Sequence, residues 1–318
     1  MFKWICYFLL FVIFGVVIIM FPSIIDYTNT GSWFFDLSKF LNDYPYLRIS
    51  TGIVFIGLGV IGLVITAFLN NRKNTAFVIF QSGEGDYGNL SLSYPKRIIG
   101  NQEPIFYENV ASLKVNSRSI LELDKKRISR FFDRLRDKKK IAFLGVGLFP
   151  FIVYAGFKVG NAGQKVVYYH YNRQSGKSQL VRTGISVNHS FQIEDCSTSD
   201  DNKKELTIAV SVSYQVDKQY VLNQFSNTDI IFLKSLETGT EVVTNKKTLE
   251  YMADCVRETI GSKSKHHNVV NLLLSCPSEL CFAIGCRLSS PGLPLVRVYN
   301  FNKKSHTNKW DWFIDLDK

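Results

Sequence analysis

Two long apolar runs near the N-terminus contain no charged residue, and they constrain the fold more than any other feature. The first covers residues 4–25 and the second covers residues 49–69. Each is as long as the roughly 20 apolar residues that a helix needs to cross ~30 Å of hydrocarbon. A signal peptide would have a shorter apolar region and a cleavage site between small residues, whereas the first run is long and includes Phe21 and Pro22. The two runs predict a transmembrane hairpin.

The charges that flank these runs indicate how the hairpin is oriented. Two spans place both chain ends on the same side of the membrane, and Lys and Arg are enriched on the cytoplasmic side. Lys3, Arg72 and Lys73 lie on the side of the termini, against Lys39 and Arg48 in the connecting loop. This small excess favours cytoplasmic termini. Six cysteines without a C-x-x-C pair agree with free thiols in a reducing compartment.

The loop between the two runs has a helical pattern of its own. Its apolar residues are spaced as one face of a helix and are Trp33, Phe34, Leu37, Phe40, Leu41 and Tyr44. Ser32 can cap the start of this helix, and Pro45 ends it. We expect an amphipathic helix that lies in the membrane interface. The alternative is an aromatic belt around an irregular loop.

Glycines in the second run mark a face that another helix can approach closely. Gly52, Gly59 and Gly62 fall on one stripe of a helix, whereas Gly57 lies off it. Small residues favour helix association in membranes, so this stripe is a candidate self-association face. Neither run contains Asp, Glu, Lys, Arg or His, the residues that mark ion paths. A conventional selective channel is therefore not indicated.

The net charge of +11 has its largest contribution after the hairpin. Residues 74–105 are rich in Gly, Pro, Asn and Ser, and we expect a linker with some strand character. A helix is then expected over residues 121–140, with nine bases and three acids between Asp124 and Lys140. Its basic face either attracts phosphates or an anionic lipid leaflet, or is the solvated face of a helix that covers a sheet.

Residues 141–173 have the pattern of a βαβ unit: an apolar strand, a glycine-rich turn, a helix and a second strand. Gly145 and Gly147 let a ligand approach the backbone. Pro150 suits the first turn of a helix whose free N–H groups favour an anion. NAD binding would need an acid after the second strand, and that stretch, Tyr169–Arg173, contains none.

The same pattern returns about 130 residues later. Ala155–Val159 in the first helix parallels Ile284–Leu288 in the second, and Tyr169–Arg173 parallels Tyr299–Lys303. The expected fold class is therefore an α-helical transmembrane hairpin plus two tandem α/β units. Open parallel sheets bind ligands beyond the carboxyl ends of their strands, so two such edges facing each other would make one composite site.

The motifs of common enzymes and metal sites are not found in the sequence. The string QSGKSQ resembles the end of a P-loop, but Tyr171 stands where its first glycine should be. Cys276, Cys281 and Cys286 are spaced by five residues and cannot converge on one metal from a helix. The five histidines show no catalytic or metal-binding pattern. We therefore expect no enzyme activity, no metal and no cofactor.

Four segments of the chain resemble a known family. They are LTIAVSVSY from residue 206, VVNLLLSCPSELCFAIGCRL from residue 269, LVRVYNF from residue 295 and WDWFIDL from residue 310. The chain is similar to SAVED domains, which are two fused CARF-like Rossmann units. With its hairpin it resembles the two-transmembrane SAVED effectors of CBASS anti-phage systems. The implied domains are a hairpin (1–73), a linker (74–105) and a SAVED domain (106–318) with units over 106–184 and 185–318.

The resemblance implies a receptor for a cyclic di- or trinucleotide. In such effectors the messenger binds the SAVED head and drives self-association into homo-oligomers, and the clustered hairpins disrupt the inner membrane, causing abortive infection. The implied partners are the cyclic oligonucleotide, the lipid bilayer and further copies of the chain, but not DNA or RNA. The implied location is the bacterial inner membrane, with two passes and the head in the cytoplasm.

Two alternatives stay open beside this interpretation. One is a membrane-anchored CARF-like enzyme that cleaves its cyclic ligand. The other is a CRISPR-linked sensor of cyclic oligoadenylate that acts as a scaffold.

The resemblance also implies which residues contact the ligand, namely those in loops that follow the strands of both units. They are Gly145, Val146, Gly147, Phe149, Tyr171 and Arg173 in the first unit, and Ser213, Tyr214, Ser275, Cys276, Ser278, Asn300, Asn302 and Lys303 in the second. Helix N-terminal N–H groups, Arg173 and Lys303 suit phosphates, aromatic rings suit base stacking, and Ser or Asn can read base edges.

Overall fold

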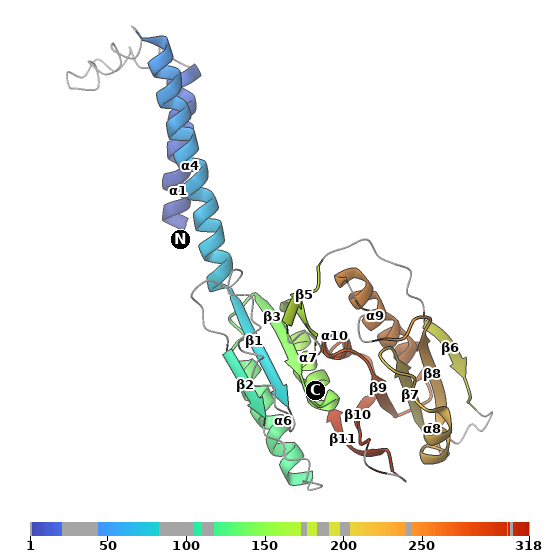
Figure 1. The fold of residues 1–318 in the computed structure, drawn as a ribbon. Coiled ribbons are helices and arrows are strands. Elements are labelled where there is room, and N and C mark those ends of the chain that lie inside the picture. Colours follow the sequence, from blue (N-terminus) through green and yellow to red (C-terminus); the bar gives the residue numbers. More distant parts are fainter. Residues whose placement is uncertain are drawn as a thin grey trace. The chain divides into compact units, whose positions relative to one another are not determined.

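The structure is a computed structural model in which the chain divides into two compact units, Met1–Asn74 and Thr75–Lys318 (Figure 1). The described residues are 2–20, 44–82, 105–109, 118–172, 177–182, 191–197, 204–239, 243, 245–303, 305 and 308–317. Each unit has its own fold.

Two apolar helices form the first unit. Helix α1 covers Phe2–Met20, and helix α4 covers Pro45–Lys73. Within the described part of the chain, one stretch is long and apolar enough to cross a membrane, and it is Ile49–Leu69 in α4. This stretch has the bounds predicted for the second span. The end of the first predicted span (residues 21–25) and most of the predicted interfacial helix lie outside the described residues.

The predicted glycine stripe of α4 is the face that packs on α1. A Cβ atom on Gly59 would lie 2.9 Å from the carbonyl oxygen of Phe8, and one on Gly52 would lie 2.9 Å from the carbonyl oxygen of Gly15. Off the stripe, a Cβ atom on Gly57 would meet nothing within 4 Å. The glycines therefore bring the two helices of one hairpin together. The stripe is occupied by α1 rather than open to a second copy.

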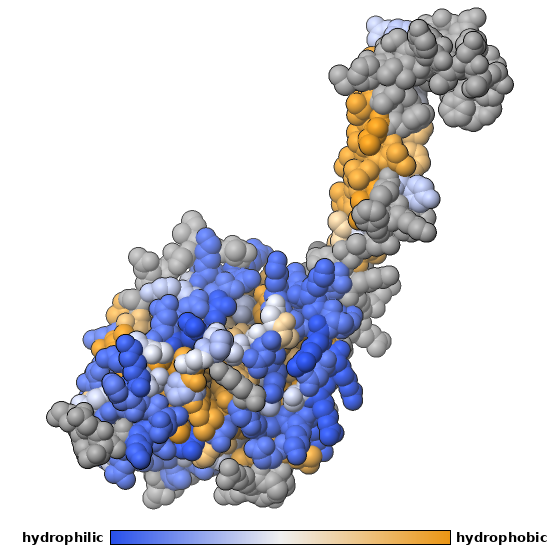
Figure 2. All heavy atoms as spheres, turned by 180° about the vertical axis from the view of Figure 1, so that it is seen from behind, coloured by the Kyte–Doolittle hydropathy of each residue, from blue (hydrophilic) through white to orange (hydrophobic). Residues whose placement is uncertain are grey.

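The remaining surface of the hairpin is apolar. Large side chains such as Leu10, Ile53 and Val64 are 58%, 58% and 63% exposed. Figure 2 shows this hydrophobic surface, which contrasts with the largely hydrophilic surface of the second unit. An exposed apolar surface of this extent is typical of a membrane-embedded or protein-binding segment.

The first sheet of the second unit has the strand order β2-β1-β3-β4-β5. Its elements are β1 (Thr75–Ser82), β2 (Ile105–Asn109), α6 (Arg118–Asp133), β3 (Lys140–Val146), α7 (Phe149–Asn161), β4 (Lys165–Asn172) and β5 (Lys177–Leu180). All pairs are parallel except β4 with β5. The central strands are nearly continuous apolar runs, as expected for a parallel sheet that is buried on both faces.

The second sheet has the order β11-β10-β9-β7-β8-β6. Its elements are β6 (Phe191–Asp195), β7 (Glu205–Ser211), α8 (Lys218–Gln224), β8 (Asp229–Ser235), α9 (Lys246–Lys263), β9 (Val269–Ser275), α10 (Ser278–Leu288), β10 (Leu295–Phe301) and β11 (Trp310–Leu316). The four central strands are parallel, and β6 and β11 are antiparallel to their neighbours.

The two sheets are copies of one arrangement, which confirms the predicted tandem α/β fold. Strands β2, β1, β3, β4 and β5 correspond to β8, β7, β9, β10 and β11, and β6 adds an edge to the second sheet. The first copy starts with β1 at Thr75, inside the range 74–105 that the sequence suggested as a linker. The reason is that Ala76–Phe80 is a buried apolar run, which pairs with β3 in the centre of the sheet.

Helices α7 and α10 join the two copies through glycine. A Cβ atom on Gly156 would lie 2.9 Å from the carbonyl carbon of Phe282, and one on Gly285 would lie 2.9 Å from the amide nitrogen of Phe157. The two glycines occupy equivalent positions in the repeat. Beside them, the Phe282 ring stacks on Phe143 of β3, with 3.7 Å between ring centroids. One continuous core therefore includes residues of both copies.

Helix α6 is shorter than the helix expected over residues 121–140. It ends at Asp133, and a turn leads to β3 at Lys140. The side-chain amide of Gln164 donates to the carbonyl oxygens of Leu135 (2.6 Å) and Lys138 (2.7 Å). These carbonyl groups therefore bond to a neighbouring loop instead of continuing the helix.

The glycine contact generates a stability prediction. Gly285→Ala should lower the free energy of unfolding by about 1–3 kcal/mol, because the added methyl group forces α7 and α10 apart. In Gly261→Ala the nearest atom, Leu293 Cδ2, is 3.7 Å from the new Cβ, so this control should be neutral or stabilising by up to about 1 kcal/mol. Urea unfolding of the full chain in detergent, followed by circular dichroism, checks both. Equal stability of the two variants would contradict the prediction.

Candidate functional site

The first turns of α7 and α10 lie on the same side of the helix pair. Gly156 lies against Phe282, and one turn later Gly160 lies against Cys286 and Ser289. Because the contacts advance together along both helices, the two helices run in the same direction. Their N-terminal ends, which carry free N–H groups and the positive end of the helix dipole, therefore point to one side.

Each of these helices starts three residues after a buried central strand ends. Helix α7 begins at Phe149 after β3, and α10 begins at Ser278 after β9. The N-cap residues are Leu148 and Pro277, and neither side chain caps its helix. Neither first turn therefore has a side-chain acceptor, which suits an anion. The Leu280 N–H of α10 already donates to the Pro277 carbonyl oxygen (3.0 Å), and Pro150 of α7 has no N–H.

Four of the predicted ligand-binding residues lie at the junction of β3 and α7: Gly145 and Val146 end β3, Gly147 follows it, and Phe149 starts α7. Gly147 has a φ of 146°, a conformation that favours glycine. Gly145 is buried, and a side chain there would meet the ring of Phe143. Val146 is buried in a small core cluster, and Phe149 is half-buried against the main core. Val146 therefore presents only its backbone to a ligand at this edge.

The loops after β7 and β9 are joined by hydrogen bonds, which bring three predicted residues together. The Ser213 N–H donates to the carbonyl oxygen of Ser275 (2.8 Å), and the Tyr214 N–H donates to the Ser275 hydroxyl (3.2 Å). The Tyr214 side chain is 69% exposed and available for stacking. Ser278 is half-buried, whereas the Cys276 side chain belongs to the core. Cys276 therefore also offers only its backbone.

The predicted residues at the end of β10 are part of the β10–β11 hairpin. The Asn300 and Asn302 amides donate to the two carboxylate oxygens of Asp311, at 3.3 and 2.8 Å. The Lys303 carbonyl oxygen accepts from Lys309 Nζ at 3.3 Å, and the Lys303 side chain is exposed. The two asparagines thus hold the hairpin, and Lys303 keeps its charge at the surface.

Strand β4 brings the end of the first copy beside the second copy. Tyr171 is half-buried near the end of β4, and Arg173 lies outside the described residues. His170 Nδ1 is 2.8 Å from Glu279 Oε1 in the first turn of α10. The Glu279 side chain is 2% exposed and that of His170 is 23% exposed, so this contact is a partly buried bridge between the copies.

The first turn of α7 makes the reciprocal contact. The ring centroid of Phe151 lies 5.6 Å from that of Trp312 on β11 of the second copy. The two helix starts are thus each in contact with the other copy, and the composite ligand site stays a prediction.

Sequence reasoning missed the residues that bridge the copies. His170 is one of five histidines that show no catalytic or metal-binding pattern, and Glu279 is an ordinary acidic residue in a first helical turn. The two are 109 residues apart in the sequence. A local pattern gives no sign of such a pair, and the same holds for Phe151 with Trp312.

Burial makes two cysteines next to the site unreactive. It raises the pKa of the Cys286 thiol to about 12 and that of Cys281 well above its ordinary value. Both are therefore protonated thiols at neutral pH. The groups that the site offers are backbone N–H groups, hydroxyls, amides and aromatic rings.

The fold is a tandem pair of Rossmann-like α/β units with a shared helix interface. Ligands of open α/β sheets bind beyond the carboxyl ends of the strands. The family model of the SMODS-associated and fused to various effectors sensor domain matches residues 124–316. The chain therefore belongs to the SAVED family, as the sequence motifs predicted. A comparison with curated proteins gives no match.

Solved structures with a similar fold are SAVED/CARF-domain receptors. The chain is similar to Acinetobacter baumannii Cap4 with the cyclic trinucleotide 3'3'3'-cAAA (12% identity, TM-score 0.52, 91% of this chain and 63% of that chain). It is equally similar to Moraxella osloensis Cap4 (11% identity, TM-score 0.52, 91% and 62%). The chain thus spans less than two thirds of these receptors, and the likeness concerns the fold.

The bridge between the copies generates the second prediction. His170→Ala removes a partner of the buried Glu279 carboxylate and should lower the free energy of unfolding by about 1–3 kcal/mol. His170→Gln keeps an N–H donor and should recover part of this loss. The control His266→Ala changes an exposed histidine and should have no effect. Thermal unfolding of the full chain in detergent measures the stability of all three variants. A His170→Ala variant as stable as the parent would show that the bridge contributes nothing to stability.

Proposed function

We propose that the chain is a membrane-anchored receptor for a cyclic oligonucleotide, with a cyclic di- or trinucleotide as the ligand. The proposal depends mainly on one observation: a SAVED-family head has two parallel helix N-termini without side-chain caps, one from each copy. A cyclic oligonucleotide has phosphates distributed around a ring, so it needs anion-binding groups from more than one element. The cyclic trinucleotide in the Cap4 receptor supports this ligand class.

The ligand contacts in this proposal are those that the family resemblance implies, divided by the chemistry of each group. The backbones of Gly145, Val146, Gly147 and Cys276, with the first turns at Phe149 and Ser278, serve the phosphates together with Arg173 and Lys303. Tyr171 and Tyr214 stack on bases, and Ser213, Ser275, Asn300 and Asn302 line the edge where base atoms are read. The head acts as a sensor without catalysis.

The hairpin converts ligand binding into a change at the membrane. In this proposal α1 and α4 cross the bacterial inner membrane, and the head lies in the cytoplasm. Ligand-bound heads assemble into homo-oligomers, and the clustered hairpins disrupt the membrane and cause abortive infection as an antiviral defence. The support is the apolar stretch Ile49–Leu69 and the exposed apolar surface of both helices.

Ligand binding is tested with the full chain in detergent against cyclic di-, tri- and tetranucleotides by calorimetry. We expect saturable binding of a di- or trinucleotide. Tyr214→Ala should weaken it by roughly tenfold or more, because a stacked base is worth about 1–3 kcal/mol. The control Tyr251→Ala removes a tyrosine that is also exposed, on α9, and should bind normally. Failure of every cyclic nucleotide to bind would contradict the proposed receptor function.

Membrane disruption is tested with the full chain in vesicles that contain a self-quenched dye. Addition of the cyclic nucleotide found in the binding screen should release the dye, and the Tyr214→Ala variant should need a higher ligand concentration. Linear nucleotide of the same composition is the control and should release none. Ligand that binds without dye release would reject the disruption step and leave the receptor intact.

A further inference from the structure

The parallel strands of the first sheet all begin at one edge, which we call the amino edge. At this edge the start of β1 lies in one row with two lysines. Thr75 of β1 pairs with Lys140 of β3, and Lys140 pairs with Lys165 of β4. Neighbouring strands are ~4.8 Å apart, so the Cα atom of Lys165 is roughly 10 Å from that of Thr75. The turn before β3 adds Arg134 and Lys139 to this edge, and Gln164 holds that turn against the start of β4.

These bases differ from those that α6 uses within the head. Lys125 is buried and pairs with Asp317 at 3.0 Å, and Arg127 pairs with Asp124 at 3.4 Å. By contrast, the amino-edge cluster, which we define as Arg134, Lys139, Lys140 and Lys165, forms no ion pair with any acidic residue that the structure describes. Arg134–Lys140 has five bases and one acid. The cluster is thus a positive surface that the fold does not neutralise.

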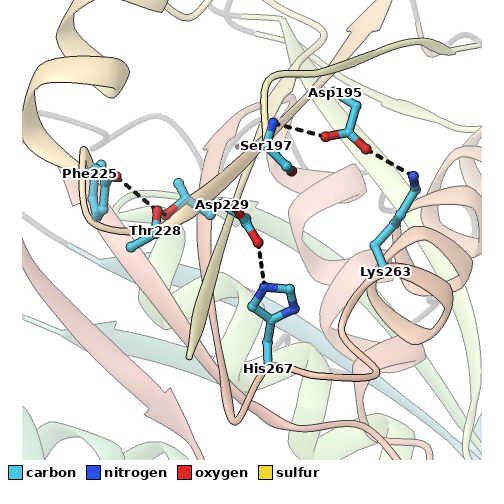
Figure 3. A network of polar contacts seen from close by, with 8 residues as sticks. Asp195, Ser197, Phe225, Thr228, Asp229, Lys263 and His267 are labelled. Atoms are coloured by element: carbon cyan, nitrogen blue, oxygen red, sulfur yellow. Dashed lines mark hydrogen bonds and ion pairs between the residues drawn. The ribbon is translucent and has the colours of Figure 1, made fainter. Parts of the chain in front are cut away.

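The second copy supplies an internal comparison. Its equivalent row is Glu205, Val269 and Leu295, which contains no base. At the end of α9 and in the turn that follows it, Lys263 and His267 have acidic partners (Figure 3), whereas Lys265 is exposed. Lys263 Nζ lies 2.9 Å from Asp195 Oδ2, and His267 Nε2 lies 2.9 Å from Asp229 Oδ2. The paired row at this edge therefore contains two lysines in the first copy, and one acidic and two apolar residues in the second.

The basic edge belongs to the copy that is joined to the apolar helix. Helix α4 ends at Lys73 and β1 begins at Thr75, so a single residue, Asn74, separates them. Six residues lead from Leu69, the end of the apolar stretch, to Thr75, and they span at most about 22 Å. Chain connectivity alone therefore keeps this row near the end of the stretch that enters the membrane.

We propose that the amino-edge cluster binds the headgroups of anionic phospholipids. This inference rests on the membrane placement in the proposed function. Basic groups close to a membrane surface gain from its negative potential, an attraction that decays within a Debye length of about 8 Å. The lysines that lack internal partners stand at the edge that the chain tethers to the bilayer. The contact orients the first sheet toward the lipid surface and leaves the carboxyl edge, where the ligand loops lie, at the far end of the strands.

The test uses the full chain in detergent, titrated with phosphatidylglycerol or phosphatidylcholine and followed by native mass spectrometry. Lys139→Gln/Lys165→Gln should weaken phosphatidylglycerol binding by about fivefold for each charge removed, with phosphatidylcholine binding unchanged. The matched control Lys204→Gln/Lys265→Gln removes two exposed bases from the second copy and should bind as the parent does. Lys139→Arg/Lys165→Arg keeps the charge and should also bind normally, which separates charge from folding defects.

Three results would overturn the inference. The first is an equal loss of phosphatidylglycerol binding in the test and control variants. The second is phosphatidylglycerol binding that inorganic phosphate at the same concentration abolishes, which would identify a phosphate site instead. The third is failure of the full chain to float with vesicles, which would contradict the proposed placement in the membrane. A chain that floats and binds cyclic nucleotide, yet retains lipid equally in all variants, overturns this inference and leaves the proposed function standing.

Discussion

The backbone contact between α7 and α10 is the constraint on which the head depends. Gly156 and Gly285 have no side chain, so two helices that each belong to a different sheet can touch along their backbones. This contact fixes the direction of both helices and brings Phe282 onto Phe143, so that a single core serves both copies. It also determines where both helix starts lie. A larger residue at either glycine would change the core and the site together.

The fold was predictable wherever the signal was local. The repeated strand, glycine turn and helix showed the duplication, and the equivalence of Gly156 with Gly285 was readable before their contact was known. Strand β1 was different, because five apolar residues in Ala76–Phe80 can be a strand in many settings. Their partner, β3, starts at Lys140, and a pairing over that distance leaves no trace in local composition. The sequence therefore suggested a linker with some strand character.

The site shows the same division between what is local and what is not. Strand ends and helix starts identified the loops, because parallel strands place their carboxyl ends at one edge. Side-chain direction at those ends was not readable. Val146 and Cys276 point into the core, and two predicted asparagines bond to Asp311. The fold, rather than residue type, decides which neighbouring positions face outward.

Duplication within one chain has a consequence for selectivity. Two identical subunits would have to present the same residues on both sides of a twofold axis. Fusion lifts that restriction, and the helix starts have diverged: Phe149 and Pro150 stand where the other copy has Ser278 and Glu279. A small molecule held between them meets unlike chemistry on its two halves. In the proposed receptor, such a cradle would distinguish a ring of mixed nucleobases from a uniform one, which a symmetric dimer does less readily.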